Sequence, residues 1–229
     1  MNKKIILASL FAFTMSASYA EEINFNNGYD VALKAGTLGV GIDVSTMVSP
    51  MFGIRGNLNG ASYNDNRDAG DLNYDTDINF FSIGLIGDYH PFSGSFRMSG
   101  GLYYNDNAVT GNFTPRSNET FQLGDHTYSA SEIGKVTTDI EWENTISPYL
   151  GIGWGNNSNA KGWGFSFDVG ALYQGTTQIT TTPNINASVP AAERAQIQAD
   201  ANRETKTIED DISDYTWYPV LSIGVTYAF

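Results

Sequence analysis

The residues best suited to chemistry in this sequence are isolated charges within segments that are otherwise apolar or small. Asp43, Arg55, Asp88, Arg97 and Asp168 each alternate along the chain with apolar side chains. A charge that a fold encloses must be ion-paired or hydrogen-bonded, because an unpaired one costs several kcal/mol. We therefore expect these five residues to form a buried network. It would either fill an interior structurally or line it to select ions or polar solutes.

Acid–base and nucleophilic chemistry has little support. His90 and His126 are the only histidines, and the chain has no cysteine. Asp88, His90 and Ser93 could serve as acid, base and nucleophile, but alternate strand residues followed by a turn need not converge. We predict a protein that is not an enzyme, with no catalytic residue and no cofactor.

One acidic segment, 64–77, could bind a hard cation. It carries five aspartates against the single arginine Arg67, and the aspartates are Asp65, Asp68, Asp71, Asp75 and Asp77. Closely spaced carboxylates can hold Ca²⁺, but the order of ligands and glycine found in an EF-hand is missing. A solvated acidic loop is favoured over a metal site, and Ca²⁺ binding stays open.

Composition restricts the class of protein. The formal net charge of −13 disfavours nucleic acid, whose phosphates are bound by surplus Lys and Arg. Charged residues are only 16% of the chain, and Gly, Phe and Tyr number 24, 13 and 13. This composition is unlike that of a disordered chain, which is rich in charge and poor in aromatic residues.

The first twenty residues have the pattern of an export signal. Lys3 and Lys4 precede an apolar run over 5–13, and Ser18, Tyr19 and Ala20 provide the small residues that a signal peptidase needs. The run is too short to span a bilayer as a helix, which takes about 20 residues. We expect cleavage after Ala20, leaving 21–229 as one domain that is periplasmic, secreted or in the outer membrane.

A period of two dominates the remainder. Every second residue of segment 163–173 is apolar, and similar alternation occurs in 52–59, 81–89, 96–105 and 146–154. A soluble β-sandwich also alternates, but its outer face usually carries many Lys and Glu. Here the second face carries Gly, Ser, Asn and isolated charges, which suit a narrow enclosed interior. The pattern therefore favours a membrane-spanning barrel.

Connections and aromatic residues support the same interpretation. Short connections at 49–51, 90–94 and 155–161 alternate with long ones at 64–75, 106–139 and 175–214, as periplasmic turns and extracellular loops do. Aromatic residues form two belts, Phe52, Tyr89, Phe92, Phe96, Trp154, Trp163 and Phe229 near the short connections, and Tyr63, Tyr74, Tyr103, Tyr104, Trp142, Tyr173, Tyr215 and Trp217 near the long ones. The two interfaces of a bilayer select such belts.

Seven strands are clear, beginning near Leu38, Phe52, Ile78, Phe96, Ile146, Trp163 and Tyr215. The apolar phase switches around Gly36, which indicates a bulge in one strand or a tight turn between two. We favour the turn, and hence eight strands, because bacterial single-chain barrels have even counts. The last long loop contains a helical pattern over 191–208, which Ser188 could cap and whose early turn Pro190 suits. Ile197 and Ile208 are its expected apolar anchors.

The last strand carries the most specific motif. Its apolar residues alternate up to a terminal aromatic, and they are Leu221, Ile223, Val225, Tyr227 and Phe229. Together with segments 96–105, 148–155 and 218–225, this resembles small Gram-negative outer-membrane β-barrel proteins of the broad OmpA/OmpW type. The resemblance implies that the C-terminal strand is the signal for the barrel-assembly machinery. The resemblance says little about activity, because that class includes anchors, small-molecule conduits and lipid-modifying enzymes. No catalytic motif of the class maps onto these residues, so no catalytic residue is carried over.

These observations predict an all-β protein: a transmembrane antiparallel up-and-down barrel of eight strands with long extracellular loops and a short helix in the last loop. We expect a monomer in the cell outer membrane, in contact with outer-membrane lipid and lipopolysaccharide. Its role would be structural or made through its loops, with an interior filled by side chains. The alternative is a transport protein admitting small solutes through a narrow channel or conduit.

Overall fold

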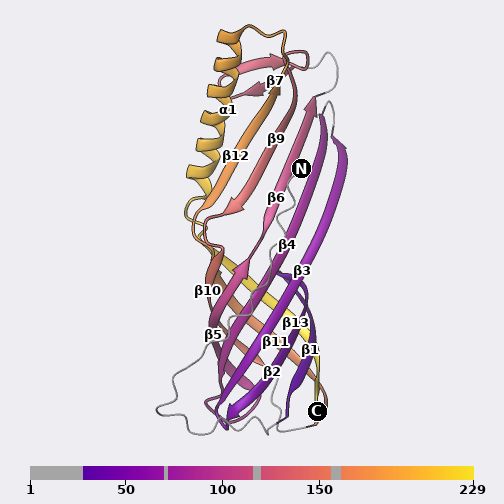
Figure 1. The fold of residues 1–229 in the computed structure, drawn as a ribbon, viewed down its shortest axis with the longest axis vertical. Coiled ribbons are helices and arrows are strands. Elements are labelled where there is room, and N and C mark those ends of the chain that lie inside the picture. Colours follow the sequence, from indigo (N-terminus) through magenta and orange to yellow (C-terminus); the bar gives the residue numbers. More distant parts are fainter. Residues whose placement is uncertain (1–27, 70–71, 116–119, 156–160) are drawn as a thin grey trace.

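Eight strands close into an antiparallel barrel in the computed structural model, which describes residues 28–69, 72–115, 120–155 and 161–229. The barrel strands are β1 (Asp30–Gly36), β2 (Gly39–Ser49), β3 (Phe52–Ala69), β4 (Leu72–Tyr89), β5 (Phe96–Asn105), β10 (Ile146–Trp154), β11 (Gly162–Tyr173) and β13 (Trp217–Ala228). They pair in the order β4-β3-β2-β1-β13-β11-β10-β5, and the β4–β5 pairing closes the ring (Figure 1). The predicted signal segment 1–20 lies outside the described residues.

Each barrel strand exposes one face and buries the other. In β2, Val40, Ile42 and Val44 are 61, 47 and 52% exposed, whereas Asp43 and Ser45, which alternate with them, are buried. Contiguous apolar surface of this extent is unusual on a soluble monomer and matches the lipid-facing band of a membrane barrel. The predicted alternation is therefore confirmed.

The phase switch near Gly36 is a tight turn. Gly36 pairs with Gly39, so Thr37 and Leu38 alone connect β1 to β2. Gly39 adopts a φ of +95°, a conformation that residues with a Cβ rarely adopt. The predicted eighth strand is β1, and the even count brings both ends of the described chain to the same end of the barrel, where Asp30 pairs with Ala228.

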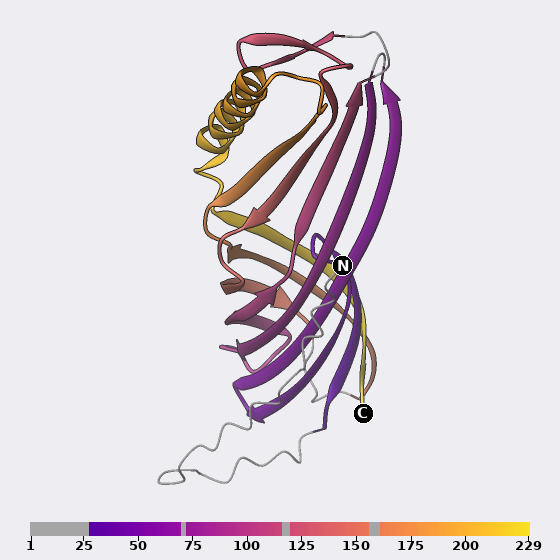
Figure 2. The same ribbon diagram turned by 45° about the horizontal axis from the view of Figure 1, so that its top comes forward.

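Above the barrel stands an upper module, built largely from the long connections. β6 (Ala108–Pro115), β9 (Ile133–Trp142) and β12 (Thr177–Ile185) extend the sheet beyond β4, and β7 (Thr120–Leu123) and β8 (His126–Ser129) form a separate hairpin. Figure 2 shows β3 and β4 continuing from the barrel into this sheet. The segment 64–75, which we expected to be a loop, is mostly paired strand, because the β3–β4 register runs unbroken from Phe52↔Tyr89 to Ala69↔Leu72.

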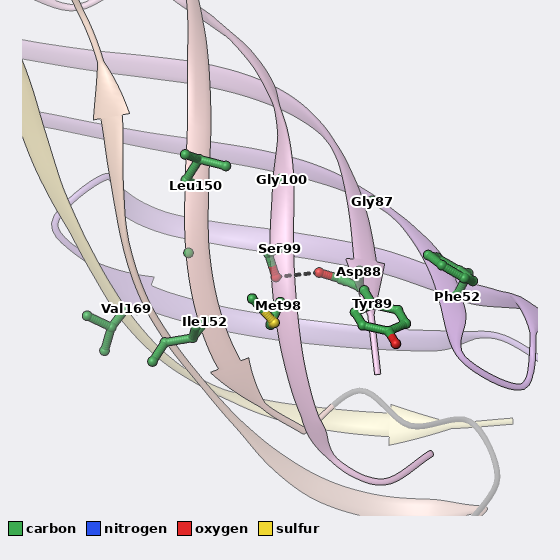
Figure 3. A pocket seen from close by; sticks show the side chains of 11 residues that line it. Phe52, Gly87, Asp88, Tyr89, Met98, Ser99, Gly100, Leu150, Ile152 and Val169 are labelled. Atoms are coloured by element: carbon green, nitrogen blue, oxygen red, sulfur yellow. Dashed lines mark hydrogen bonds between the residues drawn. The ribbon is translucent and has the colours of Figure 1, made fainter. Parts of the chain in front are cut away.

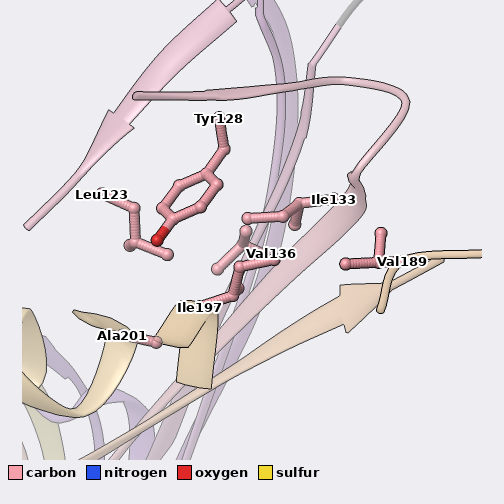
Figure 4. Packing of buried hydrophobic residues seen from close by; sticks show 7 residues of the cluster. All are labelled: Leu123, Tyr128, Ile133, Val136, Val189, Ile197 and Ala201. Carbon is pink, nitrogen blue, oxygen red and sulfur yellow. The ribbon is translucent and has the colours of Figure 1, made fainter. Parts of the chain in front are cut away.

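Helix α1 (Ala191–Ile212) packs on β12 and completes the module's core. The core consists of Leu123, Tyr128, Ile133, Val136, Val189, Ile197 and Ala201 (Figure 4). Of the two predicted anchors, Ile197 is buried, but Ile208 is 40% exposed and was wrongly assigned. The predicted cap was also wrong, because Ser188 bonds to the Asn186 side chain and Pro190 occupies the N-cap position.

No helix among the described residues is both long and apolar enough to cross a membrane.

Candidate functional site in the barrel interior

The lower half of the barrel encloses a network of ion pairs. Arg55 bonds Asp88 through two parallel contacts of 2.9 Å, from Nε to Oδ2 and from Nη2 to Oδ1. Both side chains are almost fully buried, with 1 and 4% of their surface exposed. Such forked, charge-assisted pairs fix geometry as well as charge, so this pair holds β3 to β4 across the lumen face.

Asp168 on β11 joins the network from the opposite wall. Its carboxylate accepts from Lys34 Nζ at 2.9 Å, from Arg97 Nη2 at 2.5 Å and from Arg55 Nη1 at 3.3 Å. Asp43 on β2 is bonded by Lys34 at 2.9 Å and by Arg55 at 3.2 Å. The structure thus brings together all five residues singled out from the sequence.

Lys34 is the member that sequence reasoning missed. It lies on β1, whose inward face carries Asp30, Ala32 and Lys34. Once β1 is a strand of its own, the same alternation places Lys34 inside, so the phase switch at Gly36 was the available signal. With Lys34 included, three cations meet the three aspartates Asp43, Asp88 and Asp168, and the ion-paired set is balanced in charge.

Polar side chains continue the network upward. Asn57 donates to the Asp43 carboxylate, and Asn59 donates to the Ser82 hydroxyl at 3.0 Å. On the β5 side, Ser99 donates to Asp88 at 2.5 Å. The contacts of Asn57 and Ser99 give hydrogen-bond partners to buried carboxylate oxygens, which would destabilise the fold if they were left unpaired.

An apolar cluster closes the barrel above this polar layer. It consists of Leu38, Ile86, Tyr103, Tyr149, Leu172 and Val220. The Tyr103 and Tyr149 rings meet edge-on at 5.5 Å between centroids. Assigning Tyr103 to the upper aromatic belt was therefore wrong, because it shares the inward face of β5 with Arg97 and Ser99 and is 3% exposed.

Little space is left inside. The void bordered by Lys34, Asn57, Asn59 and Tyr103 has a volume of about 10 Å³, roughly the minimum that one water molecule needs. A larger depression of about 650 Å³ lies on the outer wall, where Gly87 faces Gly100 and Phe52, Met98 and Leu150 border the gap (Figure 3). Most of its lining comes from outward-facing apolar residues, including Ile152 and Val169, while Asp88 and Ser99 lie at its base.

The Asp88, His90 and Ser93 triple is occupied by structural contacts. The Asp88 oxygens accept from Arg55 and Ser99, and Nδ1 of His90 lies 2.8 Å from the carbonyl oxygen of Gly94. Ser93 sits in the turn with a φ of +50°. These three residues hold the β4–β5 connection in shape.

The acidic segment forms part of the β3–β4 hairpin. Asn64 donates to Asp77 at 2.6 Å across the two strands. Asp71 and the side chain of Asp68 lie outside the described residues. Over the part of the chain that the structure describes, no three His or carboxylate side chains gather as a metal site would require.

The C-terminal row of β13 faces outward. Leu221, Ile223, Val225 and Phe229 are 48, 65, 43 and 47% exposed. Phe229 stacks on Tyr29 of the first segment at 4.6 Å between ring centroids. The row is thus available on the barrel's outer wall where the strand closes the ring.

A second buried carboxylate lies in the upper module. Asp200 of α1 accepts from the Tyr128 hydroxyl at 2.6 Å, His126 Nδ1 at 2.8 Å and Gln196 at 3.1 Å. These bonds hold the pKa of Asp200 below its ordinary value, the Tyr128 bond having the largest effect. Burial, followed by the bond to Asp200, raises the pKa of Tyr128 to about 12. Asp200 therefore fastens the β7–β8 hairpin to the helix.

Two solved structures are similar to this protein in fold. Acinetobacter baumannii CarO2 is 21% identical with a TM-score of 0.58, and A. baumannii CarO is 22% identical with a TM-score of 0.57. Both alignments cover 88% of this chain and 97% of the other. The chain has the fold of an outer-membrane β-barrel protein.

A major outer membrane protein from Thermus thermophilus, 13% identical over 88% of this chain and 98% of its own, has a TM-score of 0.44, too low to carry an argument. No protein-family model and no curated protein matches the sequence. The eight-stranded barrel fold is confirmed, whereas the narrower OmpA/OmpW resemblance stays a prediction.

Proposed function

We propose that this protein is a closed, non-enzymatic barrel of the cell outer membrane whose contribution is structural or made through its upper module. The observation that carries the proposal is the filled interior. A charge-balanced ion-pair layer and an apolar cluster occupy successive levels of the lumen and leave a void of about 10 Å³. A solute conduit would instead need a continuous polar path.

The partners follow from the two faces of the barrel. The outward apolar rows contact outer-membrane lipid, and the upper module stands at the level of lipopolysaccharide sugars and of neighbouring proteins. The exposed row of β13 ending at Phe229 is recognised by the outer-membrane assembly machinery. The ring closes within one chain, and that supports a monomer.

Planar-bilayer conductance and liposome swelling test the closed barrel. We expect the purified protein to produce no ohmic steps and no uptake of small sugars or amino acids, with a known porin as the positive control. A well-resolved ohmic channel in the unmodified protein would overturn the proposal in favour of small-solute transport. Localisation is tested separately by sucrose-gradient fractionation of inner and outer membranes.

A further inference from the structure

The upper half of β3 is an open sheet edge. β2 pairs with β3 as far as Val40↔Gly60, while β3 itself continues to Ala69. Above Gly60 the pairing partner of β3, within the described residues, is β4 alone. Figures 1 and 2 show this part of β3 as the outermost strand of the upper sheet.

Hydrogen bonds on β4 determine which backbone groups face that edge. Phe81 N–H donates to the Asn107 side-chain oxygen at 3.0 Å, and Phe81 C=O accepts from Asp106 N–H at 2.8 Å. Both groups of Phe81 therefore point away from β3. Gly60 is the residue of β3 that pairs with Phe81, so its backbone N–H and C=O groups point away from β4. Successive residues of a strand point their backbone N–H and C=O groups to opposite edges, so every second residue after Gly60 points the same way as Gly60. The N–H and C=O groups of Ser62, Asn64 and Asn66 therefore face the open edge.

The opposite edge of the same sheet is covered. Helix α1 packs along β12, and the Glu209 carboxylate accepts the backbone N–H of Ile179 at 2.9 Å. Native sheets usually protect a bare edge with proline, lysine or a bulge. Segment 60–66 has neither proline nor lysine, its register with β4 is unbroken, and its one charged residue is the acidic Asp65. The chain thus caps one edge and leaves the other ready to pair.

A second copy in the same membrane does not fit this edge. Both copies of β3 would rise from the membrane in the same direction, so their pairing would be parallel and could not close a symmetric dimer. Charge also opposes it, since the adjacent strand β4 carries Asp75 and Asp77 and the chain is strongly acidic. The fitting occupant is therefore a cationic segment of another polypeptide.

We propose that the upper edge of β3 binds an extended, Lys- or Arg-bearing segment of a partner protein by strand addition. The Ser62, Asn64 and Asn66 backbones supply the hydrogen bonds that give such complexes their affinity. The side chain of Tyr63 is 55% exposed and projects from the face of the strand opposite to the side chains of Ser62 and Asn64. It offers an aromatic contact to an apolar side chain of the partner. The inference rests on the proposed function, because it names a partner class for the upper module.

The test is a pair of substitutions at one position, measured on the full-length protein in detergent micelles. Asn64→Pro removes the edge N–H and the Asn64–Asp77 side-chain bond, whereas Asn64→Ala removes only the side-chain bond. The probe is a fluorescent capped octapeptide of alternating Lys and Val, followed by anisotropy. We expect Asn64→Pro to weaken binding at least about tenfold and Asn64→Ala less than about threefold.

A second peptide separates strand addition from general charge attraction. It has the same four lysines but proline in place of the two central valines, so it cannot extend a sheet. Equal binding of the two peptides, or equal binding by Asn64→Pro and the unmodified protein, would overturn the proposal.

Hydrogen exchange on the unmodified protein keeps the test decisive if Asn64→Pro fails to fold. The alternating peptide should slow exchange at the edge-facing amides of Ser62, Asn64 and Asn66 at least about tenfold more than at Tyr63, which already pairs with β4. Unselective or absent protection contradicts strand addition. Conductance of the same preparation is independent, so an open channel would refute the closed barrel without touching this result.

Discussion

At the scale of single residues, the barrel interior depends on mutual neutralisation. Each carboxylate of the ion-paired layer contacts more than one cation, and Arg55 reaches Asp43, Asp88 and Asp168 at once. A buried network of this kind is costly to break, because removing one partner strands a charge that was already desolvated. The expected effect of a substitution is thus on stability rather than on permeation.

Arg97→Ala tests this expectation. Arg97 donates to Asp168 and to the Gly155 carbonyl oxygen, both at 2.5 Å, and is fully buried. Its loss should lower the melting temperature by an amount corresponding to about 3–5 kcal/mol, without creating bilayer conductance. Lys206→Ala, which removes an exposed helix ion pair with Asp210, is the control and should leave the melting temperature unchanged. An unchanged midpoint for Arg97→Ala, or new ohmic steps, would contradict the structural role.

Asp200→Asn should change how the upper module responds to acid. A carboxyl whose pKa is lowered in the folded state stabilises that state above its unfolded pKa, and the effect disappears as pH falls through the folded pKa. We therefore expect the β7–β8 hairpin to exchange amide protons faster in Asp200→Asn than in the unmodified protein at pH 7. The two should converge as the solution is acidified below the ordinary Asp range, after correction for intrinsic exchange. A difference that persists at low pH would argue against this linkage.

How far residues could be placed from sequence depended on the strand phase. Where alternation was clear, as at Arg55 and Asp168, direction into the barrel followed directly. Placement failed at two residues where the alternation of inward and outward side chains was not followed. Lys34 was overlooked because it precedes the phase switch at Gly36. Tyr103 was assigned to a belt because it is aromatic, although its position in the alternation of β5 points inward. The actual ion pairs required the ring closure that brings β3 and β11 to face one another, which no local pattern contains.

At the scale of elements, the membrane strands were predictable and the strands of the upper module were not. Lipid imposes an apolar residue at every second position, so barrel strands have a strong sequence period. β12 reads TQITTTPNI, with threonines on both faces and Pro183 within it, and its pairing with β9 comes from tertiary context. The helix was predictable because a run of helix formers is a local signal, although its cap was misassigned and its buried face was only half correct.

Ile197→Ala should detach the helix without opening the barrel. Ile197 is fully buried against the module's core, so truncation should cost about 2–5 kcal/mol of local stability. Ile208→Ala on the same helix is the matched control, because that side chain is 40% exposed. Limited proteolysis should cut 186–214 faster in Ile197→Ala only, while heat-modifiable migration in gels stays intact in both. Equal protection of the two variants would show that the cluster does not hold α1.

At the scale of the whole molecule, barrel and upper module are joined by shared strands but closed separately. Every ladder of the ring, including β4–β5 and β11–β13, forms without residues of β6–β9, β12 or α1. The module has its own buried cluster and the barrel has another. The fold therefore consists of a closed eight-stranded ring and an accessory sheet inserted into two of its connections.

Replacing residues 107–144 and 175–215 by short turns should leave a folded ring. β5 and β10, and likewise β11 and β13, pair directly, so short hairpin turns can join them. We expect heat-modifiable migration and a β-rich circular dichroism spectrum in detergent, with loss of any binding that resides in the module. Aggregation of this variant under conditions in which the full chain folds would show that the ring needs the module.

The unbroken run of β3 and β4 from barrel to module has a mechanical consequence. A tether pulling outward on the hairpin tip would load the β2–β3 and β4–β5 ladders in shear, so that many backbone bonds resist together rather than opening one after another. Helix α1 packs on β12, whose strand partner within the described residues is β9 alone, so the helix and β12 would detach first. If the barrel lies in the outer membrane as proposed, an outward pull would detach the helix before it extracted the barrel.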